Sequence, residues 1–92
     1  MTTEQGIERI KKMAQFKDNW NGYGSKAFSP SVIARALLLI EGMEPPPLVS
    51  PTGRDSIQFE WVNKELYLEM EIFSDGIKIY NTYADEVDIG GK

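Results

Sequence analysis

The stretch SIQFEWVNKELYLEMEIFSDGIKIY, residues 56–80, decides the fold that the sequence predicts. Apolar and polar side chains alternate through most of it, a pattern that is typical of strands with one buried face. Turn-forming residues interrupt the alternation at Asn63-Lys64 and at Asp75-Gly76. The stretch therefore predicts an antiparallel meander with strands at about residues 56–62, 66–73 and 77–83.

Each turn is interpreted as a two-residue loop, and each loop fixes the register of its hairpin. The first pairs Trp61 with Leu66, Phe59 with Leu68 and Ile57 with Met70, and the second pairs Ile72 with Ile79, Met70 with Asn81 and Leu68 with Tyr83. Both turns place apolar side chains on the same face, so we expect the rest of the chain to cover that face. The second turn also predicts a positive φ at Gly76, where alanine would be strained.

Helices are predicted before the sheet, at about residues 3–18 and 30–42. Thr3 caps the first helix, and its buried stripe consists of Ile7, Ile10, Met13 and Ala14. The second helix has Ser29 as its N-cap, Pro30 at its first position and Gly42 as its C-cap. Three prolines at 45–47 then predict a stiff, extended linker.

These elements predict one α+β domain over residues 1–92, with two N-terminal helices packed on one face of a three- to four-stranded antiparallel β-meander. The tail, residues 84–92, is the candidate for the fourth strand. A chain of 92 residues, 41% of them hydrophobic, has room for a single core.

The residue types and segments that the sequence lacks restrict the catalytic chemistry and the cellular location that we expect. The chain has no cysteine, which excludes disulfides and thiolate catalysis, and no histidine, the commonest general base and zinc ligand. We therefore expect no cofactor and no metal. The longest uncharged apolar run, residues 36–40, is far too short to span a membrane, and no signal peptide is visible. These observations predict a cytoplasmic location.

The charge is divided unevenly along the chain. Residues 1–54 carry seven Lys/Arg and five Asp/Glu, a net charge of +2, whereas residues 55–92 carry three and nine, a net charge of −6. An acidic half repels phosphate backbones, so the pattern favours a partner protein with a basic surface and disfavours nucleic acid. A nucleic-acid-binding accessory role stays open through the cations of the amino-terminal half: Arg9, Lys11, Lys12, Lys17 and Lys26.

The outward face of the predicted sheet collects acidic and aromatic side chains: Glu60, Tyr67, Glu69, Glu71 and Tyr80. Acids beside rigid aromatics are typical of a surface that binds a protein. Carboxylates held close together can also bind a hard metal ion or share acid and base roles, which leaves a small carboxylate-based or metal-dependent enzyme as the alternative. A solvated sheet face is the simplest interpretation of the same pattern.

Two further candidates lie outside the strands. Trp20 and Tyr23 stand in the glycine-rich loop NWNGYG, residues 19–24, where they can anchor a partner or close the end of the core. Arg54 can clamp a partner's carboxylate, or it can pair internally with Asp55 or a sheet glutamate.

The blocks NWNGYG, residues 19–24, and PTGRDSIQFE, residues 51–60, together with Phe28-Ser29 and with LEMEIF, residues 68–73, resemble a group of short uncharacterised bacterial and mobile-element proteins. The resemblance implies a bacterial or phage origin and transfers no catalytic residue. With no catalytic set visible, the sequence predicts a non-catalytic protein-binding module, such as an inhibitor or accessory factor encoded by a phage or another mobile element.

Overall fold

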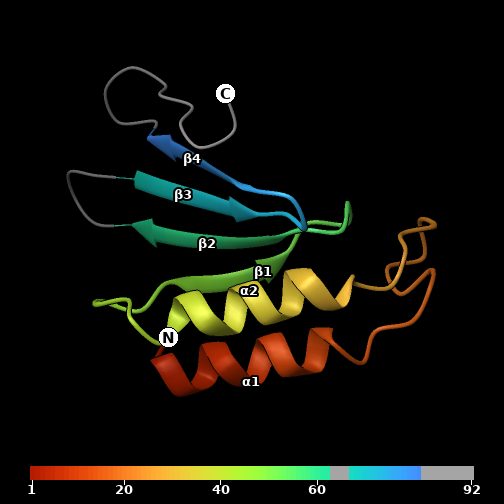
Figure 1. Cartoon of the computed structure of the whole chain (residues 1–92), viewed down its shortest axis with the longest axis horizontal. Coiled ribbons are helices and arrows are strands. Elements are labelled where there is room, and N and C mark those ends of the chain that lie inside the picture. The colour runs from red at the N-terminus through yellow and green to blue at the C-terminus, as the bar shows by residue number, and fades with distance from the viewer. Residues whose placement is uncertain (63–66, 82–92) are drawn as a thin grey trace.

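The computed structural model describes residues 1–62 and 67–81, and it confirms the α+β fold (Figure 1). Its elements are α1 (Thr3–Met13), α2 (Pro30–Ile40), β1 (Leu48–Pro51), β2 (Ile57–Val62), β3 (Tyr67–Ile72) and β4 (Ile77–Asn81). The strands form an antiparallel sheet in the order β1-β2-β3-β4. Figure 1 shows the two helices side by side in a layer next to the β1 edge of the sheet.

The fourth strand is β1, where the sequence predicted only an extended linker. Its residues Leu48 to Pro51 pair with Glu60 to Ile57 of β2. A strand that ends in proline suits a sheet edge, because one side of its backbone needs no ladder partner. The tail, the predicted place for a fourth strand, lies outside the described residues.

Both predicted registers are wrong by two residues. Phe59 pairs with Met70 instead of Leu68, and Ile72 pairs with Ile77 instead of Ile79. The second hairpin turns through Ser74-Asp75, closed by a hydrogen bond from the Phe73 N–H to the Gly76 carbonyl at 2.8 Å. A shift of two leaves every side chain on its predicted face, because side chains alternate with a period of two.

The position of that turn also corrects the prediction for Gly76. Among the described glycines, the positive φ angles belong to Gly22, Gly24 and Gly53. Gly76 only closes the turn, so its conformation is open to other residues. The first predicted turn, Asn63-Lys64, lies outside the described residues.

Both helices end earlier than predicted. Thr2, not Thr3, caps α1 in a capping box with Gln5, and the helix ends at Met13 with Ala14 as its C-cap. For α2 the C-cap is Glu41 instead of Gly42. No helix in the part of the chain that the structure describes is long and apolar enough to cross a membrane.

The core lies between the helices and the inner face of the sheet. Its buried members are Ile10, Met13, Phe28, Val32, Ala36, Ile40, Val49, Ile57, Phe59 and Ile72. Gly6 brings α1 close to its neighbours, since a Cβ there would lie 2.5 Å from Ile40 Cδ1 and 3.2 Å from Val49 Cγ2. The opposite face of the sheet is left uncovered by the helices.

Candidate functional site

The outer face of the sheet carries two rows of side chains that cross all of its strands. One row is Leu48, Glu60, Glu69 and Tyr80, and the next is Ser50, Gln58, Glu71 and Lys78. Tyr67 follows on β3, opposite Val62. The structure therefore brings the predicted sheet residues together on one face.

Glu60 and Glu69 are directly opposite one another on β2 and β3. The Tyr67 hydroxyl donates to Glu69 Oε1 at 2.9 Å. Its hydrogen bond with Glu60, followed by its partial burial and its bond to Glu69, raises the pKa of Tyr67 well above the usual value for a phenol. Like charges directly opposite in a sheet are destabilising. Within the described residues the ion pairs are Lys26–Asp18 and Arg54–Glu71, so neither glutamate of this pair forms an ion pair there, and Glu69 acts on Arg54 only from beyond ion-pair distance.

Glu71 lies on the same face but is buried, with only 2% of its surface exposed. Arg54 covers it with two parallel bonds, Nε to Oε2 at 2.8 Å and Nη2 to Oε1 at 2.6 Å, and Ser56 donates a third. Burial by itself raises the pKa of Glu71, but these hydrogen bonds and the charge of Arg54 outweigh it and lower the pKa. Of the interpretations of Arg54, the internal pair with a sheet glutamate is the one that the structure contains. Glu71 is therefore closed to a partner, contrary to its predicted place on an accessible surface.

Trp20 and Tyr23 have different environments within the same loop. Trp20 stacks on Phe28 at 5.7 Å between ring centroids and contacts Phe16 at 5.0 Å, and its Nε1 donates to the Lys26 carbonyl at 3.0 Å. Tyr23 is 91% exposed. Trp20 thus closes the end of the core, while Tyr23 alone is accessible.

The residues that follow the NWNGYG block, Ser25 and Ser29, contact the PTGRDSIQFE block in the structure. Ser25, just after the first block, donates through Oγ to the Gly53 carbonyl at 2.7 Å. Asp55 accepts from the Ser29 N–H at 2.8 Å and from its hydroxyl. The blocks therefore join the helix layer to the sheet, and these contacts give them a structural role.

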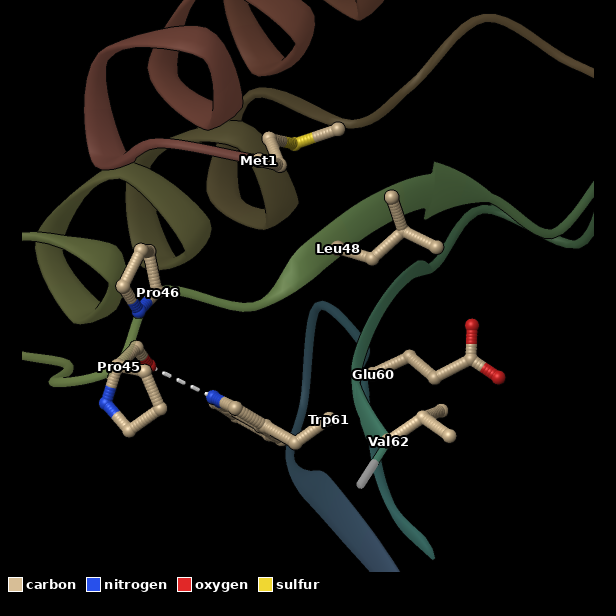
Figure 2. A pocket seen from close by; sticks show the side chains of 7 residues that line it. All are labelled: Met1, Pro45, Pro46, Leu48, Glu60, Trp61 and Val62. Atoms are coloured by element: carbon tan, nitrogen blue, oxygen red, sulfur yellow. Dashed lines mark hydrogen bonds between the residues drawn. The ribbon is translucent and has the colours of Figure 1, made fainter. Parts of the chain in front are cut away.

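A groove of about 340 Å³ opens where β1 begins and β2 ends (Figure 2). It is lined by Met1, Pro45, Pro46, Leu48, Glu60, Trp61 and Val62. The Trp61 Nε1 donates to the Pro45 carbonyl at 2.8 Å, which fixes the indole beside the prolines. Leu48 and Val62 are 45% and 68% exposed although both are apolar. Sequence reasoning missed this groove because it depends on β1, the strand that was not predicted.

Among residues 1–62 and 67–81 there is no group of three or more acidic side chains placed to hold a metal ion. The predicted trio Glu60, Glu69 and Glu71 is divided, because Arg54 neutralises Glu71. Comparisons with protein-family models, curated proteins and solved structures give no significant match to this chain.

Proposed function

We propose that this chain is a non-catalytic protein-binding module whose outer sheet face receives a basic surface of a partner protein. The observation that carries the proposal is the Glu60–Glu69 pair, two carboxylates that are opposite in register and have no cation among the described residues. A lysine or arginine of a partner would relieve their repulsion, and the gain would exist only in the complex.

The tyrosines beside this pair suit the same role. Tyr67 is held by the bond from its hydroxyl to Glu69 Oε1, and Tyr80 is the neighbour of Glu69 on β4. Aromatic side chains with few free torsions supply contact area at a small entropic cost and are frequent hot spots. The face combines charge for steering with area for holding a complex together.

The biological setting is part of the proposal. The resemblance of the two sequence blocks supports an inhibitor or accessory factor encoded by a phage or another mobile element. The absence of cysteine suits a reducing compartment and supports a cytoplasmic location.

The test is affinity capture from a bacterial lysate with the wild type and the double variant Glu60→Gln/Glu69→Gln, with captured proteins identified by mass spectrometry. A matched control, Glu8→Gln/Glu41→Gln, removes the same charge from exposed positions outside the sheet. We expect the wild type and the control to capture the same basic protein, the double variant to lose it, and added salt to weaken its capture. If the double variant captures the same proteins as the wild type, the proposal is wrong.

A metal titration followed by thermal unfolding separates this proposal from the enzyme alternative. Binding of Mg²⁺, Mn²⁺ or Zn²⁺ to the native protein would raise its melting temperature by mass action. We expect no rise. A rise that disappears in Glu60→Gln/Glu69→Gln would assign the carboxylates to a metal instead of a partner.

A further inference from the structure

The groove that opens where β1 begins and β2 ends continues directly into the proposed binding face. Glu60 belongs to both, because it lines the groove and pairs with Glu69 on the outer row. Figure 2 shows Leu48, Glu60 and Val62 pointing to the same side of the sheet. An apolar surface and a carboxylate pair that forms no ion pair among the described residues therefore meet at one residue.

We propose that the groove receives one apolar side chain from an extended segment of the partner protein, and that lysine or arginine residues flank this side chain and bind Glu60 and Glu69. This inference rests on the proposed function and specifies its partner as an apolar residue between cations. Neither a basic patch alone nor an apolar peptide alone fits the site.

The requirement for both features follows from the cost of removing a carboxylate from water. An apolar group seated against Leu48 and Val62 would also cover Glu60, which lines the same groove. Covering an ionised carboxylate without a compensating charge is costly, so an apolar occupant needs a cation beside it. A cation without the apolar side chain would leave Leu48 and Val62 in water.

The groove is also prepared for its occupant. The hydrogen bond from Trp61 to the Pro45 carbonyl fixes the indole, and Pro45 and Pro46 restrict the backbone of the neighbouring wall. Binding to a preformed wall avoids the entropic cost of ordering side chains. An extended segment suits the place because its side chains two positions apart point the same way, so that cations two positions from the seated apolar residue face Glu60 and Glu69.

The test uses three short capped peptides and two-dimensional ¹H–¹⁵N NMR of the full chain. The first has the sequence Arg-Gly-Leu-Gly-Arg, the second replaces leucine by serine, and the third replaces both arginines by glutamine. The Trp61 indole N–H reports on the groove, and the Trp20 indole N–H, bonded to Lys26 in the loop between the helices, is the internal control. We expect the first peptide to shift the Trp61 signal without shifting that of Trp20, and to bind about tenfold more tightly than either of the others.

Variants of the protein show which residues cause the preference for leucine and which cause the preference for arginine. Leu48→Thr and Val62→Thr keep residues that suit a strand, and we expect each to reduce the preference for leucine over serine while arginine-dependent binding persists. Glu60→Gln/Glu69→Gln should remove the preference for arginine over glutamine. Melting curves establish that each variant is folded.

The outcomes separate this inference from the function on which it rests. Equal binding of the leucine and serine peptides, lost in the glutamate variant, would overturn the groove assignment and leave the proposed function standing. Equal binding of the arginine and glutamine peptides would overturn the requirement for cations. If no peptide shifts the signals of the groove or of the Glu60–Glu69 row, the groove inference is wrong, and the capture experiment alone decides the proposed function.

Discussion

Glu69 and Glu71 are two positions apart on β3 and share a face, yet they have opposite environments. The loop between β1 and β2 brings Arg54 onto Glu71 and leaves Glu69 beside Tyr67. The sequence predicted the shared face correctly from alternation. It could not distinguish the two acids, because the position of Arg54 depends on the backbone of its loop, in which Gly53 and Asp55 have positive φ angles of 89° and 57°.

Removing Arg54 should show how much this cover stabilises the fold. Arg54→Met leaves a buried carboxylate without its cation, and we expect it to lower the free energy of unfolding by about 2–3 kcal/mol, less than for a fully buried pair because Arg54 itself is largely exposed. Urea denaturation measures the change. The control is Lys26→Met, which breaks an exposed ion pair at 4.0 Å and should cost no more than about 0.5 kcal/mol. Equal effects would contradict a special role for Arg54.

We expect the ionisation of Glu71 to make the free energy of unfolding depend on pH in the acidic range. Burial opposes ionisation, but the bonds from Arg54 and Ser56 prevail and its folded pKa is lowered. Its contribution to stability is therefore fully present above the unfolded pKa of about 4.3, and it is lost as the pH falls through the folded pKa. We expect the difference in unfolding free energy between the wild type and Glu71→Gln to be largest near about pH 7 and to shrink below about pH 4.

The comparison for this pH series is Glu8→Gln, at an exposed position on α1. Its difference from the wild type should stay small throughout. A difference for Glu71→Gln that is constant from neutral to acidic pH would show that its charge contributes nothing.

Among the elements, the buried faces of the strands were predicted correctly from the sequence, whereas the pairing of one strand with the next was not. Alternation placed Ile57, Phe59 and Ile72 inside, and all three are buried. The register of β3 with β4 was displaced because the hairpin turns at Ser74-Asp75 and not at the stronger turn signal one residue later. β1 was missed because a strand of four residues bounded by prolines gives too short a pattern to recognise.

The packing of α1 depends on the absence of a side chain at Gly6. Ile40 and Val49, its nearest neighbours, are both fully buried and have little room to move. We expect Gly6→Val to lower the free energy of unfolding by roughly 1–3 kcal/mol through overpacking, although glycine is itself a poor helix former. Thermal or urea unfolding tests this, with Glu8→Val on the exposed side of α1 as the control. A Gly6→Val variant as stable as its control would mean that α1 lies further from α2 and β1.

At the scale of the whole molecule, the helix layer and the sheet are joined by polar contacts as well as by the core. Asp55 receives the N–H and hydroxyl of Ser29, the residue that begins α2, and thereby ties that helix to the loop between β1 and β2. Sequence reasoning treated Asp55 only as a possible partner of Arg54. The pairing with Ser29 crosses 26 positions of the chain and has no local signal.

We expect Asp55→Ala to cost about 1–3 kcal/mol, because it removes both bonds and places alanine at a positive φ. Asp55→Gly separates the causes, since glycine accepts that φ but makes neither bond. If Asp55→Gly is as stable as the wild type in urea, the contacts with Ser29 contribute nothing and the strain alone explains the alanine variant.

The candidate site was predictable only in part for a related reason. Period-two alternation was enough to gather Glu60, Tyr67, Glu69 and Tyr80 on one face. The burial of Glu71 and the groove beside Trp61 both depend on segments that fold back from elsewhere in the chain, Arg54 in one case and Pro45 in the other. Contacts between distant segments produce no repeating pattern in the sequence from which they could be predicted.

The two tryptophans of the chain have a practical consequence for kinetics. Each indole N–H donates to a backbone carbonyl, Trp20 to Lys26 before α2 and Trp61 to Pro45 after it, so α2, a helix of 11 residues and roughly 16 Å in length, lies between the two carbonyls in the chain. Trp20→Phe and Trp61→Phe would each leave a single tryptophan, whose emission can be excited selectively over that of the tyrosines. Stopped-flow emission from the two variants could then time events at the groove and at the interhelical loop separately, without an attached dye.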